Sequence, residues 1–369
     1  MPTKAVPLHP LCKNGPSVPA LGFGLMGLSL QTYGPVPNDE DRFAVLGRAV
    51  ELGATFWDTS DLYSDSEELL GKWFKRTVKR DQIFLATKFG LIPKGHAFEV
   101  NSSLTYCKKS CAESLKRLGV DSIDLCKALR FQIQGGGFNE TSLAIRAAHV
   151  KNNSLYCCCI CFMAAQCLGP SPYPLLESGS LTTLFATNET AYSKEGKVKH
   201  IGLSSVTSNT LRRACKIAPV AAVQTEYSVF DQAIEGPTGT DLLATCHSLG
   251  VAVVVATPPR ARPAQDPLQR GAVSQFRVLA DKKGRTVAQL ALAWLLKQGD
   301  DIFPIPGMKR IKYLEENWAS LDISLTDEED VEIRAFGKAT ELAGDSLPEK
   351  SAGEFFRDTK EESGWVRED

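Results

Sequence analysis

The chain has 369 residues, of which 43% are hydrophobic and 23% charged, as in an ordinary globular protein. Its formal net charge is −1 with both signs interspersed, so no basic face predicts nucleic-acid binding and no acidic run predicts a disordered tail. The 11 cysteines mostly lie outside disulfide-framework spacings, and residues 1–11 lack the apolar core of a secretory signal. We therefore expect reduced thiols and a cytoplasmic protein.

Strand-like runs alternate with helical patterns along most of the chain, which is typical of β/α units around a parallel sheet. The sequence predicts strands over residues 20–24, 54–57, 83–87, 122–126, 200–203, 221–224, 251–256 and 301–305. It predicts helices over residues 39–52, 66–74, 102–118, 208–217, 239–249 and 286–298, with Ser66 as an N-cap and Gly119 as a C-cap. Eight such strands predict a (β/α)8 TIM barrel.

The predicted barrel forms a single domain over residues 1–369, with its core at about 16–340 and a polar C-terminal tail at about 340–369. A doubly wound open sheet is the alternative fold, because residues 22–27 match the dinucleotide-binding pattern G-x-G-x-x-G. One such hexapeptide is common by chance, and no acidic residue follows a second strand at the right distance. We therefore favour the barrel.

One long segment, about residues 131–190, breaks the alternation after the fourth strand and carries very few charges. Its apolar part, residues 154–168, is shorter than the roughly 20 residues that a membrane span needs. In its cysteine cluster at residues 157–161, only Cys158 and Cys161 have the spacing of a zinc-binding pair. We predict a disordered or irregular insertion with no metal and no membrane contact, of the kind that a translated intron or a shifted reading frame would produce.

Polar side chains stand where the second and third predicted strands end. Asp58 and Tyr63 follow the second strand, and Lys88 follows the third. A buried carboxylate holds a neighbouring ammonium group, and the ammonium lowers the pKa of a nearby phenol so that the phenol can give up a proton near neutral pH. These three residues therefore predict a proton-donating site.

Asp58, Tyr63 and Lys88 resemble three members of the catalytic tetrad of the aldo-keto reductase family. Further motifs match the family in the same order, at residues 202–204, 224–228, 304–310 and 313–317. The chain looks most like the fungal and plant aldehyde and pyridoxal reductases that use NADPH. The resemblance implies NADPH-dependent reduction of a small aldehyde or ketone to an alcohol, with Tyr63 as the proton donor. It leaves the substrate and the oligomeric state open.

The resemblance also implies how NADPH would be held. Ser204 and Gln224 would bind the carboxamide, and Tyr227 would stack on the nicotinamide ring. The rest of the cofactor would meet a clamp formed by Gly307, Lys309, Arg310, Glu316 and Asn317. Within this clamp, the cationic pair at 309–310 would bind the 2′-phosphate beside a helix N-terminus, and the pair at 316–317 would reach the adenine.

The chain departs from the family pattern in two places. Leu129 stands where the family has a histidine after the fourth strand, and loss of one preorganised donor typically costs about 2.7–4 kcal/mol of transition-state stabilisation. Residues 257–263 carry prolines, which lack an amide donor, where the family has a flexible phosphate loop. The alternative function is therefore a catalytically impaired or inactive homologue that at most binds cofactor.

Overall fold

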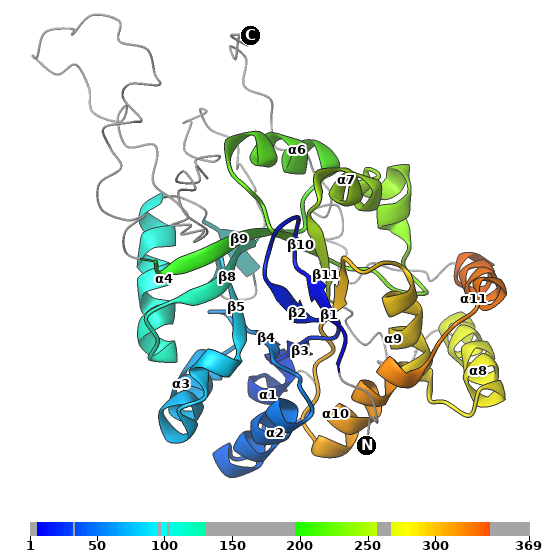
Figure 1. Cartoon of the computed structure of the whole chain (residues 1–369), viewed down its shortest axis with the longest axis horizontal. Helices are drawn as coiled ribbons and strands as arrows, with labels where there is room; N and C mark the ends of the chain where they lie inside the picture. The colour runs from blue at the N-terminus through cyan, green and yellow to red at the C-terminus, as the bar shows by residue number, and fades with distance from the viewer. Residues whose placement is uncertain are drawn as a thin grey trace, which may run out of the picture.

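The computed structural model describes residues 6–31, 34–94, 97–101, 104–129, 196–256 and 267–339. Within them, eight parallel strands form one sheet in the order β12-β11-β10-β9-β8-β5-β4-β3, ringed by helices (Figure 1). The strands are β3 (Phe23–Gly24), β4 (Phe56–Asp58), β5 (Phe84–Phe89), β8 (Ile123–Leu129), β9 (Val198–Ser204), β10 (Ala222–Thr225), β11 (Ala252–Val255) and β12 (Ile302–Pro304). The predicted eight-stranded α/β fold is confirmed.

Glycines close the sheet into a barrel by letting β3 approach the end of β12. The Gly24 amide donates to Pro306 O at 3.1 Å, and Gly24 forms a parallel bridge with Gly307. A Cβ added at Gly24 would lie 2.5 Å from Ile305 O, so any other residue would push the two segments apart. Gly24 of the G-x-G-x-x-G match therefore serves barrel closure, in line with the choice of a barrel over an open sheet.

The predicted helices are all present, and the described residues contain four more α-helices. The predicted set corresponds to α2 (Asp39–Glu51), α3 (Ser66–Thr77), α4 (Leu104–Leu118), α6 (Ser208–Ile217), α7 (Leu242–Leu249) and α9 (Val287–Lys297). The additions are α8 (Pro267–Lys282), α10 (Ile311–Trp318) and α11 (Asp327–Ala339), besides the short α1 (Met26–Ser29). Gly119 ends α4 with a φ of +62°, as predicted. Ser66 was wrongly predicted as an N-cap: Asp65 holds that position, and the Ser66 hydroxyl accepts from Thr59 Oγ1.

Two apolar layers hold the barrel together. Alternate strand residues such as Phe56, Leu125 and Val254 fill its interior, whereas residues such as Trp57 and Leu203 face the surrounding helices. Because side chains alternate along a strand, residues two positions further on point into the same interior. The C-terminal ends of the strands thus present their polar residues to the mouth of the barrel.

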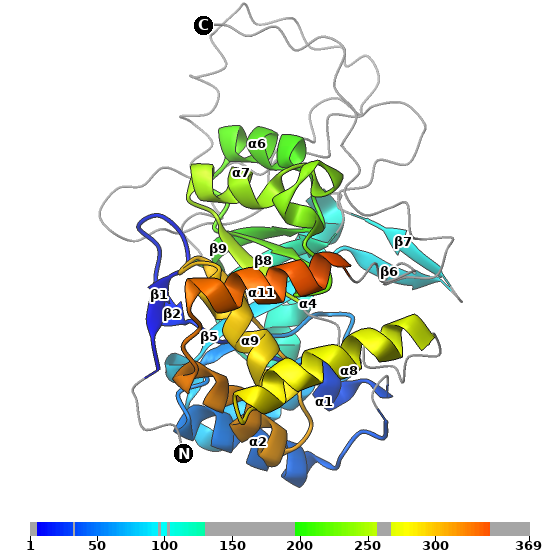
Figure 2. The ribbon, with the colours of Figure 1, turned by 90° about the vertical axis from the view of Figure 1, so that its right-hand side faces the viewer.

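Two hairpins lie at opposite ends of the barrel (Figure 2). The hairpin of β1 (Leu8–Pro10) and β2 (Ser17–Pro19) covers the end where the strands begin, with Leu11 and Val18 buried in the barrel interior. The hairpin of β6 (Leu91–Lys94) and β7 (Ala97–Val100) follows β5 at the other end, on the side of the mouth. Neither hairpin was predicted.

Several sequence expectations fall on residues outside the described ranges. They are the irregular insertion at about 131–190, the proline-rich connection at 257–263, and the tail at about 340–369.

Candidate active site

A buried carboxylate lies at the mouth of the barrel, where β4 ends. The Asp58 side chain is only 2% exposed, and its Oδ1 accepts a hydrogen bond from Lys88 Nζ of β5. Lys88 is equally buried and also donates to Thr59 O at 2.8 Å. Burial opposes the charge on Asp58, but the attraction of its lysine neighbours outweighs burial and lowers the pKa of Asp58. The structure therefore brings together the acid and the amine that the sequence predicted.

Tyr63 lies beside this pair. Lys88 Nζ is 4.9 Å from the centroid of the Tyr63 ring, within reach of a cation–π contact. Burial nevertheless raises the pKa of Tyr63 above its ordinary value, and the charges of Asp58 and Asp61 add to this rise while Lys88 opposes it. The prediction that the ammonium lowers the phenol pKa was thus right in sign for that single interaction and wrong for the net effect, because desolvation of a phenolate costs more.

A second lysine, which the sequence reasoning missed, shares the same carboxylate. Lys127 of β8 is fully buried, and its Nζ donates to Asp58 Oδ2. Burial lowers the pKa of Lys127 to about 8; the charge of Lys88 adds to this fall, and Asp58 opposes it. The site therefore contains one carboxylate between two ammonium groups.

Ser204 is the last residue of β9, and Gln224, the residue before the end of β10, lies in register with it. Both are buried at 5% exposure, and among the described residues Gln224 Oε1 has no hydrogen-bond partner. A buried acceptor without a donor is costly unless a ligand satisfies it, so this pair fits an amide group. On the other side of Ser204 in the sheet, its register partner is Leu129, the last residue of β8.

The predicted phosphate clamp lies at the start of α10. Arg310 is the N-cap residue and is exposed, α10 has no side-chain cap and no acidic residue in its first turn, and Gly307 nearby is exposed. Free amides at a helix N-terminus attract an anion. Lys309 points elsewhere in this structure: its Nζ donates to the carbonyls of Leu30, Gly34 and Pro35 at 2.7–3.2 Å.

Glu316 and Asn317 lie in the second half of α10 and are half-buried. The backbone carbonyl of Glu316 accepts from Gln289 Nε2 of α9 at 3.0 Å, which fixes α10 against its neighbour. Both residues thus lie on the helix whose N-terminus carries the cationic pair, about two turns further on.

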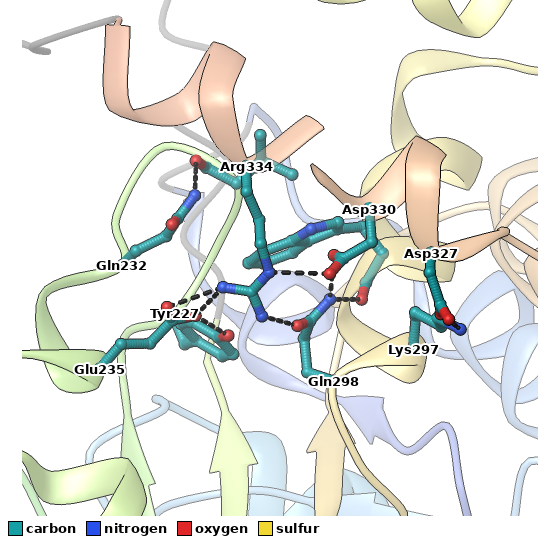
Figure 3. Close-up of polar contacts among 10 residues, drawn as sticks. Tyr227, Gln232, Glu235, Lys297, Gln298, Asp327, Asp330 and Arg334 are labelled. Carbon is teal, nitrogen blue, oxygen red and sulfur yellow. Dashed lines mark hydrogen bonds and ion pairs between the residues drawn. The ribbon is translucent and has the colours of Figure 1, made fainter. Parts of the chain in front are cut away.

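The structure does not bring Tyr227 to the site. Its side chain is fully buried, its ring packs 5.3 Å from that of Trp294, and its hydroxyl bonds to Glu235 (Figure 3). Glu235 also accepts two bonds of 2.7 Å from Arg334, so Tyr227 belongs to a network that fastens α11 to the loop after β10. Stacking on a nicotinamide needs an exposed ring face, which Tyr227 does not offer, so we assign it no part in cofactor binding.

Across the described ranges, no helix is long and apolar enough to cross a membrane. The same part of the chain holds no group of three or more His, Cys, Asp or Glu residues suited to a metal ion.

Comparisons with known proteins agree with this geometry. A profile of the "Aldo/keto reductase family" matches residues 20–135 and 189–338. The chain is 36% identical to aldo-keto reductase str7 of Strobilurus tenacellus, over 91% of this chain and 94% of that protein. It is 35% identical to aldo-keto reductase yakc [NADP(+)] of Schizosaccharomyces pombe, over 93% of this chain and 95% of that protein.

Solved structures show the same fold. An aldo-keto reductase from Bacillus halodurans in its holo form superposes with a TM-score of 0.64 at 22% identity, covering 92% of this chain and 99% of its own. An aldo/keto reductase from Klebsiella pneumoniae in complex with NADP and acetate gives a TM-score of 0.59 at 21% identity, covering 90% and 95%. Because the family profile matches most of the chain and two relatives are more than one third identical to it, this chain belongs to the aldo/keto reductase family.

Proposed function

We propose that the chain reduces small aldehydes or ketones to alcohols with NADPH, and that Tyr63 donates the proton. The observation that carries this proposal is the buried Asp58–Lys88 pair beside the Tyr63 ring at the mouth of the barrel. A buried ion pair next to a phenol stabilises the phenolate that forms when the proton leaves. The NADP dependence printed for the Schizosaccharomyces relative supports the choice of cofactor.

The proposal extends to the cofactor-binding residues, whose roles are those that the family resemblance implies. Ser204 and Gln224 would hold the carboxamide, because the unpartnered Gln224 Oε1 can accept from its amide. At the far end, the α10 N-terminus with Arg310 and Gly307 would hold the 2′-phosphate, and Glu316 and Asn317 would reach the adenine. Lys309 would join the phosphate only after its ammonium group leaves the carbonyls of the loop before α2. When bound, NADPH supplies a hydride to the carbonyl carbon.

The chain's own residues perform the proton transfer. The substrate oxygen would accept a hydrogen bond from the Tyr63 hydroxyl, and the proton would pass to it as negative charge develops there. Lys88 would hold the resulting phenolate, and Asp58 would keep Lys88 charged, since the carboxylate raises the pKa of that buried amine. Burial of Asp58 and Lys88 keeps water away from the ion pair and so strengthens its interactions.

A second candidate is a homologue that binds NADPH with little or no turnover. Leu129 occupies the β8 position in register with Ser204, and a leucine carries no hydrogen-bond donor for an oxyanion. Among the histidines that the structure describes, none takes its place: His9 lies in the hairpin at the opposite end, His200 lies four residues before the end of β9, and His247 lies in α7.

One pair of measurements separates the two candidates. Quenching of tryptophan fluorescence by NADPH reports binding, and aldehyde-dependent loss of NADPH absorbance reports turnover. Binding with turnover supports the reductase, binding without turnover supports the second candidate, and the absence of both refutes both.

A further inference from the structure

Lys127 is a buried cation for which the proposed reaction has no role yet. On the sheet it lies directly opposite Lys88 of β5 on one side and Gly202 of β9 on the other. Two like charges directly opposite each other on paired strands repel. A buried lysine is tolerated only when an acid accepts from it, and here that acid is Asp58.

The neighbouring strand leaves room for this side chain. A Cβ added at Gly202 would lie 2.7 Å from Lys127 Cγ, so the glycine makes the space through which the lysine stem runs. The stem delivers its ammonium group to Asp58 Oδ2, while Lys88 occupies Oδ1. One carboxylate is thus divided between two ammonium groups, and the three residues together carry a net positive charge.

We propose that Lys127 is a positioning residue of the proton-donating site, which holds the second oxygen of Asp58 and offsets its charge so that Lys88 keeps an uncompensated positive charge facing Tyr63. The chemical purpose of this arrangement rests on the proposed reductase function. Lys127 acts through Asp58 and does not touch the substrate.

The charges around Tyr63 give the direction of the effect. Asp58 raises the pKa of Tyr63 and Lys88 lowers it, so a cation that offsets Asp58 favours the phenolate. The groups that face Lys127 are Asp58 from β4, Lys88 from β5 and Cys126 from its own strand, while β9 presents Gly202. Cys126 stays a neutral thiol because burial raises its pKa well above the ordinary value.

The charge of Lys127 changes within an accessible pH range. With its pKa at about 8, the ammonium is present at neutral pH and lost in mildly alkaline solution. At an effective dielectric constant of about 20, loss of a unit charge within about 10 Å shifts a neighbouring pKa by on the order of one unit. We therefore expect the rate of carbonyl reduction to fall about tenfold as pH rises through about 8.

The test uses the full-length protein labelled with carbon-13 at the tyrosine Cζ position. The Tyr63 resonance is assigned as the one absent from Tyr63→Phe, and its shift is followed against pH. We expect two inflections in the wild type: one near pH 6 from Asp61, whose pKa is raised to about 6 by burial, and one near pH 8 from Lys127. In Lys127→Met only the inflection near pH 6 should persist.

Two further variants complete the test. Lys199→Met removes a half-exposed lysine of β9 that pairs with Asp124, and it should keep both inflections. Lys127→Arg keeps a cation that does not titrate, so it should lose the inflection near pH 8 yet keep the neutral-pH reduction rate, whereas Lys127→Met should retain about one tenth of it.

An inflection near pH 8 that survives in Lys127→Met and Lys127→Arg, or that is missing from the wild type, would overturn the inference. A wild type without an inflection near pH 8 overturns the inference even if both variants fail to fold. The proposed function is refuted by a different result, a wild type that binds NADPH but oxidises none of it. That result would leave the pH dependence of the Tyr63 resonance unchanged.

Discussion

Replacing Asp58 with asparagine removes the carboxylate that two buried lysines share. Asparagine has nearly the same shape, so the substitution changes charge more than packing. Lys88 and Lys127 are 2% and 0% exposed, and each donates to a different oxygen of Asp58. The variant therefore leaves two buried cations that repel each other with no acid between them.

The structure sets the size of the effect. Breaking one buried pair by removing a partner typically costs about 3–5 kcal/mol. Loss of the second pair, that of Lys127, costs less free energy than loss of the first. Burial already lowers the pKa of Lys127 to about 8, so this lysine can release its proton. We expect Asp58→Asn to lower the free energy of unfolding by about 3–5 kcal/mol at pH 7.

The loss should shrink as pH rises. In the unfolded chain lysine holds its proton up to about pH 10.4, whereas in the folded variant Lys127 loses it below pH 8, so the unfolded state binds more protons between these values. The free energy of unfolding of the variant therefore rises with pH across this window. In the wild type the pKa of Lys127 in the folded state is about 8, so the same rise begins at a higher pH and covers a narrower range. The difference in the free energy of unfolding between the wild type and Asp58→Asn therefore becomes smaller as pH rises.

Urea unfolding followed by tryptophan fluorescence, at pH 7 and pH 10, measures both effects. Asp124→Asn is the matched control: Asp124 is also buried, but its partners Arg80 and Lys199 are 23% and 47% exposed, so its cost should not fall with pH. A loss below about 1 kcal/mol for Asp58→Asn at pH 7, or a loss that stays constant to pH 10, would refute the reasoning.

Three other substitutions test the site. Leu129→His restores a donor beside Ser204 and should raise kcat/KM for an aldehyde by up to about 10²-fold; no gain in a variant that binds NADPH normally would locate the defect elsewhere. Arg310→Met should weaken NADPH binding about tenfold in a fluorescence titration and leave NADH binding nearly unchanged, since only NADPH carries the 2′-phosphate; equal losses would contradict the clamp. Gln224→Met removes the unpartnered buried oxygen, so it should keep or raise Tm while weakening binding of either nucleotide; unweakened binding would exclude Gln224 from the carboxamide site.

The barrel was predictable because its signal is local. Each of the eight strands is a short apolar run between turn residues, and their alternation with helices predicts a parallel sheet. The hairpins were missed because their strands have only three or four residues each, too few for a period to show. Helix α8 was missed although it is amphipathic, so its pattern could have been found in the sequence. Helix α11 was also predictable, since Thr326 and Glu329 bond reciprocally as a capping box at its start and Ile333 and Phe336 form an apolar face that packs on the core.

The site was predictable only in part, because its contacts join distant positions. Alternation along β8 places Lys127 on the same side as Leu125, inside the barrel, so the sequence could have flagged a lysine there. It could not show that this lysine meets Asp58, which lies 69 residues away. For Tyr227, motif order indicated a cofactor contact, whereas its partners Trp294 and Arg334 come from helices that no local pattern connects to β10.

The most direct test of the central claim is the aldehyde-dependent oxidation of NADPH by the wild type and by Tyr63→Phe, each at saturating cofactor. If Tyr63 donates the proton, the wild type turns over and the phenylalanine variant loses at least about 10²-fold in kcat/KM, with its affinity for NADPH unchanged. Equal rates in the two proteins, or a wild type that binds NADPH and oxidises none of it, would contradict the account.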